Sequence, residues 1–170
     1  VLTDFLIKKN YFVTGLDSGL FKDCLLYDET LPHNQISKDV RDVNIDDFKN
    51  VEIVIYLSAI SNDPLGEFNK KITNDINFIG AVEFAKKAKV SGVKKFIFIS
   101  SQSMYGISNT DDELDEDNSE KNPITEYAKT KWEAEKEILK LNNLEFTTVS
   151  LRPSTVFGSS PRLRCDIVFN

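Results

Sequence analysis

The sequence predicts an α/β fold with a doubly wound parallel sheet, and three observations support this prediction. Segments typical of strands alternate with segments typical of helices along the 170 residues. The strand segments 51–60 (VEIVIYLSAI) and 94–101 (KKFIFISS) are almost continuously apolar, which is typical of strands covered by helices on both faces. Small or polar residues follow the strand segments, at the positions where parallel sheets bind ligands.

Local patterns predict the individual elements. Apolar residues at helical spacing predict a helix at 1–9 and another within 66–89, and the second is followed by a turn at 91–93 (SGV). A charged, strongly helix-forming stretch predicts a further helix at 125–142. The predicted strands are 11–17, a short one at 35–40, 51–60, 94–101 and 144–152.

Composition and charge narrow the class of protein. Twenty-one basic residues against 27 acidic ones give a net charge of −6, which argues against a surface for nucleic acid or for an anionic membrane. No apolar run approaches the roughly 18 residues of a membrane span, so a cytoplasmic location is expected. Cys24 and Cys165 lie far apart without zinc-site spacing, and we expect both to be buried thiols in a reducing compartment.

Residues 108–123 carry seven acids against one lysine, which raises the question of a metal site. The segment lacks the glycine and the alternating ligand positions of a calcium loop. We therefore interpret it as a surface loop and expect no metal.

Tyr127 and Lys131 are the first candidates for chemistry. Residues four apart on a helix share one face, so the phenol and the ammonium would lie side by side near the helix start. A neighbouring cation lowers the pKa of a phenol, which would let Tyr127 transfer protons near neutral pH. The alternative is a solvated helix start, and the pair alone does not decide between the two.

Two further groups follow predicted strands. Asp17 ends the strand at 11–17, where a carboxylate can accept hydrogen bonds from the hydroxyls of an adenosine ribose and disfavours a 2′-phosphate, so it favours NAD over NADP. The alternative for Asp17 is a turn aspartate in LDSG. The hydroxyl-rich segment 100–106 (SSQSMYG) could donate a hydrogen bond to a substrate oxygen.

Together these segments resemble a known family. The strand followed by SSQSMYG, then ITEYAKTKWEAE, then VSLRPSTVFG, is similar to the extended short-chain dehydrogenase/reductases, and specifically to the NAD-dependent epimerase/dehydratase group that acts on nucleotide sugars. IYLSAISNDP and NDINFIGAVEFAKKA resemble a strand end and a helix of the same group. The resemblance runs across essentially all 170 residues and implies a Rossmann-like fold with NAD as cofactor.

The resemblance also implies roles for individual residues. Tyr127 would be the catalytic acid/base, Lys131 would bind the nicotinamide ribose and stabilise the phenolate, and Ser101 would be their hydroxyl partner. Ser103 would contact the substrate. The remaining cofactor-binding residues would be Asp17 at the adenosine ribose, Asp39 and Val40 beside the adenine, Leu57, Ser58 and Ala59 along the pyrophosphate and nicotinamide, Asn77 supporting that strand, and Pro153 bordering the nicotinamide.

The sequence departs from the family pattern at both ends. None of its seven glycines takes the G-x-x-G-x-x-G spacing of the family's phosphate loop, and the helix at 1–9 resembles the one that follows that loop. The chain also stops before most of the region that forms the sugar-nucleotide pocket. We therefore expect 1–170 to be a partial NAD(P)-binding domain with an incomplete sheet that lacks its first strand, and to be inactive and poorly stable alone.

The resemblance narrows the reaction. Dehydratases of the group carry an Asp-Glu pair where this chain has Gln102 and Ser103, which argues against 4,6-dehydration. Epimerisation or oxidoreduction at a carbon of a nucleotide sugar is therefore expected, in a homodimer formed through the helices at 66–89 and 125–142. The alternative is a catalytically silent NAD-binding sensor or scaffold of the same fold. The sugar and the carbon attacked stay open.

Overall fold

A computed structural model describes residues 1–61, 63–107 and 113–162, which form two compact units. One unit contains residues 1–43 and 155–162, and the other contains 44–154. Part of the acidic segment and Cys165 fall outside the described residues. In the part of the chain that is described, no helix combines the length and apolarity needed to cross a bilayer.

The first unit contains a helix and two parallel strands. Helix α1 (Leu2–Lys8) lies where the sequence predicts it, and β1 (Thr14–Asp17) pairs in parallel with β2 (Asn34–Ser37). Both strands are shorter than predicted. The second ends early because Asp39 accepts a hydrogen bond from the backbone N–H of Arg41 and so caps a short 3₁₀ helix, η1 (Val40–Asp42). Cys24 lies between the two strands and is exposed, so the prediction of a buried thiol is wrong for it.

The second unit is built on a three-stranded parallel sheet. Its order is β3 (Ile53–Tyr56), β4 (Lys95–Ile99) and β5 (Thr147–Leu151), with Ile53 opposite Lys95 and Lys95 opposite Thr147. A 3₁₀ helix, η2 (Ile45–Phe48), precedes β3, and another, η4 (Gln102–Tyr105), follows β4. Helical segments connect successive strands, as parallel pairing requires.

The helix predicted within 66–89 begins earlier and is interrupted. It comprises α2 (Asp63–Phe68), α3 (Lys70–Asn74), a π-helical segment η3 (Asp75–Gly80) and α4 (Ala81–Val90). The break falls at Asn69, which leaves the helical region at φ −143° and whose side chain accepts a hydrogen bond from the N–H of Ile72 at 3.1 Å. Helix α5 (Glu126–Leu139) matches its prediction closely.

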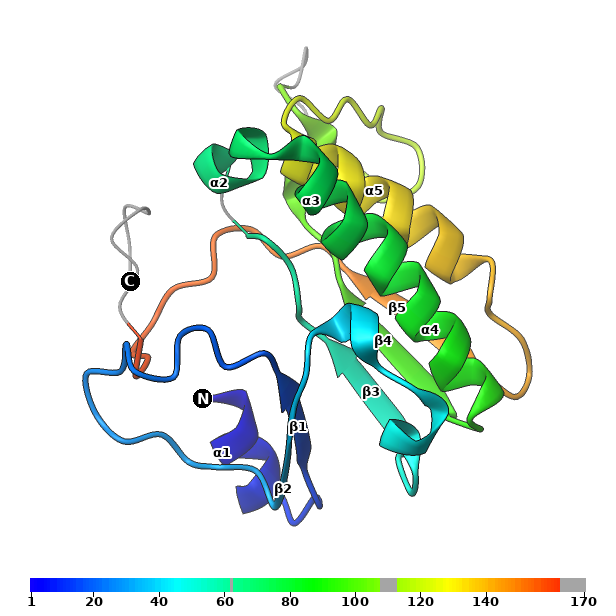
Figure 1. Cartoon of the computed structure of the whole chain (residues 1–170). Helices are drawn as coiled ribbons and strands as arrows, with labels where there is room; N and C mark the ends of the chain where they lie inside the picture. The colour runs from blue at the N-terminus through cyan, green and yellow to red at the C-terminus, as the bar shows by residue number, and fades with distance from the viewer. Residues whose placement is uncertain (62, 108–112, 163–170) are drawn as a thin grey trace. The chain divides into compact units, whose positions relative to one another are not determined.

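Aromatic side chains form the core of the second unit. Figure 1 shows α4 and α5 side by side along the β3–β4–β5 sheet, and Tyr56, Phe96 and Phe98 are buried residues of that sheet. Phe84 of α4 meets Tyr56 edge to face, with ring centroids 5.0 Å apart. This contact packs α4 against the sheet.

The opposite face of this sheet is more open. Ile53, Val149 and Leu151 are 42%, 44% and 49% exposed, although all three are apolar. Their positions alternate with those of buried strand residues such as Val54 and Thr148, as the two-residue period of a strand requires.

Strand pairing confirms the predicted parallel α/β class and the incomplete sheet. Among the described residues, β1 pairs only with β2, and β3 pairs in the sheet only with β4. One edge of β1 and one edge of β3 therefore lack a strand partner within the described ranges.

Candidate active site

The carboxyl ends of the three parallel strands gather most of the predicted site residues of the second unit. These residues are Leu57, Ser58 and Ala59 after β3, Ser101 and Ser103 after β4, and Pro153 after β5. Parallel strands place their carboxyl ends at one edge of the sheet. The N–H of Gln102 donates a hydrogen bond to the carbonyl of Pro153 at 3.2 Å, which ties the exit of β4 to that of β5.

Ser101 and Ser103 form a hydroxyl pair at the start of η4. Ser101 is buried, and its Oγ accepts a hydrogen bond from the backbone N–H of Ser103 at 3.1 Å, which caps the 3₁₀ helix. The same hydroxyl donates to Ser103 Oγ at 3.0 Å. The cap explains why a serine suits position 101 locally, and it holds both hydroxyls at the strand exit.

Tyr127 lies in the first turn of α5, where several contacts fix the helix start. Thr125 caps the helix by accepting from the N–H of Ala128 at 3.2 Å. Glu67 of α2 accepts a hydrogen bond from the N–H of Glu126 at 2.6 Å. The Glu67 carboxylate satisfies one of the free N–H groups at the start of α5 and interacts favourably with the positive end of the helix dipole. Tyr127 itself is half-buried.

Lys131 lies one helical turn beyond Tyr127 and is buried, with 2% of its surface exposed. Its Nζ stands 4.3 Å from the centroid of the Phe98 ring in β4, within the range of a cation–π contact. Burial lowers the pKa of Lys131 from 10.5 to about 7, and the charge of Glu135 opposes this shift. A lysine with this pKa is the kind of group found at catalytic sites.

Asn77 holds the segment that follows β3. It is buried in the π-helical segment η3, and its side chain accepts a hydrogen bond from the N–H of Ile60 at 2.8 Å and donates one to the carbonyl of Ile60 at 3.0 Å. The side-chain amide of Asn77 thus binds both the N–H and the carbonyl of Ile60, the residue after Ala59. Single π-helical turns occur often at functional sites.

The three predicted adenosine-side residues, Asp17, Asp39 and Val40, belong to the unit of residues 1–43 and 155–162. Asp17 Oδ1 accepts a hydrogen bond from the N–H of Gly19 at 2.6 Å, which is the turn geometry weighed as its alternative. Asp39 binds the Arg41 guanidinium at 2.8 and 2.9 Å, and this contact lowers the pKa of the Asp39 carboxyl. Val40 is buried.

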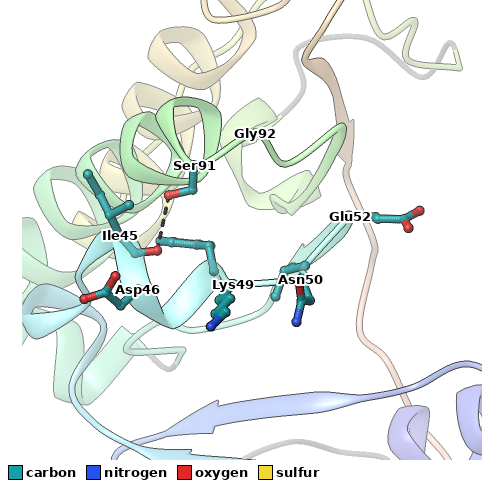
Figure 2. A pocket seen from close by; sticks show the side chains of 9 residues that line it. Ile45, Asp46, Lys49, Asn50, Glu52, Ser91 and Gly92 are labelled. Atoms are coloured by element: carbon teal, nitrogen blue, oxygen red, sulfur yellow. Dashed lines mark hydrogen bonds between the residues drawn. The ribbon is translucent and has the colours of Figure 1, made fainter.

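A surface hollow of about 550 Å³ lies at the other end of the second unit (Figure 2). Its lining includes Glu52 just before β3 and Gly92 just before β4, so it lies at the amino ends of these strands. Ser91 donates a hydrogen bond across it to the carbonyl of Ile45 at 3.4 Å. No predicted site residue lines this hollow. Within the described ranges, no group of three metal-ligating side chains occurs either.

Sequence reasoning missed a buried charged pair beside this site. Glu135 of α5 is fully buried and accepts two hydrogen bonds from Arg152, the residue after β5. The signal was available, because Glu135 lies four residues after Lys131 and Arg152 immediately precedes Pro153.

Comparison with known proteins assigns the chain to a family of nicotinamide-dependent enzymes. The model of the NAD dependent epimerase/dehydratase family matches residues 1–167. The chain belongs to this family.

Individual relatives agree with this assignment. The chain is 31% identical over 166 residues to a putative UDP-glucose 4-epimerase of Methanocaldococcus jannaschii, covering 92% of this chain and 52% of that protein. It is 30% identical over 129 residues to the N-acetyl-alpha-D-glucosaminyl-diphospho-ditrans,octacis-undecaprenol 4-epimerase of Escherichia coli O157:H7, covering 73% and 38% respectively. The chain therefore spans about half the length or less of these curated relatives.

A solved structure gives the same result. The UDP-glucuronic acid 4-epimerase of Bacillus cereus in complex with NAD superposes with a TM-score of 0.74 at 25% identity, covering 98% of this chain and 55% of that one. The fold of this chain is therefore similar to that of this structure over nearly all of the present sequence.

Proposed function

We propose that the full-length protein is an NAD-dependent epimerase or dehydrogenase/reductase that acts on a carbon of a nucleotide sugar. Residues 1–170 would be a partial NAD-binding domain of this enzyme. The observation that carries the proposal is the burial of Lys131 against Phe98 of β4, one helical turn after Tyr127, with Ser101 and Ser103 following the same strand. Family membership and the curated epimerase relatives support it.

The residues present fit a nicotinamide nucleotide. Ribose hydroxyls both donate and accept hydrogen bonds, and an ammonium and a phenol on one helix face complement them. Lys131 would bind the nicotinamide ribose, Pro153 would border the ring, and Leu57, Ser58 and Ala59 would line its path. Asn77 would hold that path in place through its two hydrogen bonds to Ile60. When bound, NAD supplies a ring that accepts a hydride and returns it.

The protein's own side chains would move the proton. Tyr127 as phenolate would take the proton of the sugar hydroxyl, and Ser101 would donate a hydrogen bond to the same oxygen as it becomes a carbonyl. The Lys131 ammonium would stabilise the phenolate, and the phenolate would in turn stabilise the ammonium, because each charge offsets the burial of the other. Ser103 would orient the sugar.

The reaction would stop short of dehydration. Gln102 and Ser103 stand where an eliminating enzyme of this group carries an acid and a base, and Gln102 donates a hydrogen bond to Ser154 Oγ at 2.9 Å. An amide side chain does not ionise at neutral pH, so it cannot act as the general acid or base. Epimerisation or oxidoreduction therefore fits these side chains better than loss of water.

The test uses the full-length protein with NAD and a panel of UDP- and other nucleotide sugars. We expect epimerised or oxidised sugar by chromatography and a change of nicotinamide absorbance during turnover. Tyr127→Phe keeps the ring and removes the acid/base, and should reduce turnover on the order of 100-fold or more. Normal turnover by Tyr127→Phe would contradict the proposed role of the phenol.

A second outcome separates enzyme from sensor. If the protein binds NAD and nucleotide sugars over the whole panel without any redox change or product, it acts as a sensor or scaffold. A preference for NAD over NADP would support the proposed contact of Asp17 with the adenosine ribose. Asp39 and Val40 are proposed to lie beside the adenine. The cytoplasmic location and the homodimer stay predictions from sequence.

A further inference from the structure

A buried ion pair, Glu135 with Arg152, includes a residue one helical turn after Lys131. Glu135 has a fully buried side chain, and its Oε1 accepts hydrogen bonds from Arg152 Nε at 3.0 Å and Nη2 at 2.6 Å. Glu135 Oε2 is buried and, among the described residues, has no hydrogen-bond partner. Burying a carboxylate with one oxygen unsatisfied costs free energy, so the pair calls for an explanation beyond packing.

Arg152 connects three segments through its guanidinium. Besides Glu135 of α5, it donates from Nη1 to the hydroxyl of Tyr105 in η4 at 2.7 Å and to the carbonyl of Glu116 at 2.6 Å. The guanidinium also lies 5.8 Å from the ring centroid of Trp132. The planar guanidinium has several donors in fixed directions and can bind all three segments at once, which the single ammonium of a lysine cannot do.

Two of the segments that Arg152 connects, η4 and α5, bear the proposed catalytic set. Ser101 caps η4, Tyr127 and Lys131 lie on α5, and Arg152 itself directly follows β5. Glu135 is one helical turn from Lys131, on the same face of α5. A junction at this point fixes how α5 and η4 lie against the end of β5.

We infer that Glu135 and Arg152 are positioning residues, which hold the hydroxyl of Ser101 and the side chains of Tyr127 and Lys131 in the arrangement that the reaction needs. This inference rests on the proposed function. It assigns neither residue a contact with substrate or cofactor.

Stability alone does not account for the pair. Replacing a buried ion pair by apolar residues of similar volume is often neutral or stabilising, whereas removing one partner leaves an uncompensated charge. A role in packing and a role in positioning therefore predict different results for a double apolar variant.

Glu135 also acts on the charge of Lys131. The Phe98 ring on β4 and the Glu135 carboxylate on its own helix act on this lysine, and Tyr127 lies one helical turn before it. Arg152, after β5, binds both Glu135 and Tyr105 of η4. Glu135→Gln should therefore lower the pKa of Lys131 further below its ordinary value.

The kinetic test compares four variants of the full-length protein. We expect Glu135→Gln and Arg152→Lys to reduce kcat on the order of 100-fold with little change in KM. Glu133→Gln, which removes an exposed pair with Lys136 on the same helix, is the matched control and should keep parental turnover. The double variant Glu135→Met with Arg152→Met should recover the melting temperature but not kcat. Parental kcat in Glu135→Gln, or in the double variant, would overturn the inference.

A second measurement does not depend on turnover. The pKa of Lys131 can be followed through its ε-carbon by NMR in NAD-free protein with ¹³C-labelled lysine, with Lys131→Arg identifying the signal. We expect the pKa of Lys131 to fall in Glu135→Gln and to stay unchanged in Glu133→Gln. An unchanged pKa in Glu135→Gln overturns the inference even if the parent is active. An inactive parent with a lowered pKa removes the proposed function but keeps the link between Glu135 and Lys131.

Discussion

At the scale of single residues, the most informative side chain is Lys131, because its burial works against the stability of the fold. The native pKa of about 7 lies below the ordinary 10.5, and burial is the main cause. Between these pH values the unfolded chain holds a proton that the native chain does not. The free energy of unfolding therefore decreases as the pH falls from 10.5 to 7, and this loss is complete below 7.

Lys131→Met should make the full-length, NAD-free protein more stable at pH 7. Removing the ionisable group relieves a cost on the order of 4 kcal/mol, and the gain should fade as the pH rises towards 10.5. Urea unfolding at a series of pH values measures it, with Lys136→Met on the exposed side of α5 as control. A gain in stability that is independent of pH would show that burial does not lower the pKa of Lys131. The same variant should lose turnover.

The sequence predicted the relative placement of functional side chains only where their spacing alone determines it. The four-residue interval between Tyr127 and Lys131 fixes a shared helix face, but nothing local reports that Lys131 is buried against Phe98. Asp17 shows the opposite limit: its position at a strand end suits a ribose contact, and its carboxylate also makes a turn with Gly19. Burial and pairing depend on contacts between distant segments, which one sequence does not display.

At the scale of elements, the sequence predicted all five strands found among the described residues and the longer helices, but not the interruptions. The strands at 51–60 and 94–101 are nearly continuous apolar runs, and α5 is a strongly helix-forming stretch with a clear cap at Thr125. The break at Asn69 and the π-helical segment around Asn77 arise because side chains bind backbone groups, in one case those of Ile60. A helical pattern of apolar residues continues through both, so periodicity does not reveal them.

Gly106, which ends η4, is an element-scale requirement that can be tested. Its φ is +65°, and a Cβ there would overlap the carbonyl oxygen of Asn122. Gly106→Ala should therefore destabilise the full-length protein by about 2–5 kcal/mol and displace the segment that carries Ser101 and Ser103.

Gly92 provides the matched control for this change. Its φ is also positive, at +86°, but a Cβ there meets nothing within 4 Å, so Gly92→Ala pays only the backbone cost of about 1 kcal/mol. Thermal unfolding of both variants measures the difference. Equal losses would mean that the approach of Asn122 to Gly106 does not constrain η4.

At the scale of the whole molecule, the two sheets are the least self-sufficient part of the chain. β1 and β3 each keep an edge without a strand partner among the described residues, and Ile53, Val149 and Leu151 leave apolar surface open on one sheet face. Unpaired strand edges and open apolar faces favour association with other chains. The sequence did not predict this open face, because the apolar runs at 51–60 and 94–101 are typical of strands covered on both faces.

A polypeptide of residues 1–170 alone should accordingly be weakly stable. We expect it to bind a hydrophobic dye such as ANS, to associate at micromolar concentration, and to unfold with a broader transition than the full-length protein. Dye fluorescence, light scattering and calorimetry measure these properties. A sharp transition at the temperature of the full-length protein, without dye binding, would contradict the expectation.

The hydroxyl pair at the start of η4 has a consequence for ligand entry. The Ser101 hydroxyl donates a hydrogen bond to Ser103 Oγ and accepts one from the backbone N–H of Ser103, so the single hydrogen of the Ser101 hydroxyl already has an acceptor. An incoming oxygen must compete for it, and the exchange of one bond for another is nearly neutral, at most about 1 kcal/mol. Ser103 Oγ thus occupies the acceptor position that a substrate oxygen would take, and it keeps the Ser101 hydroxyl oriented until the substrate binds.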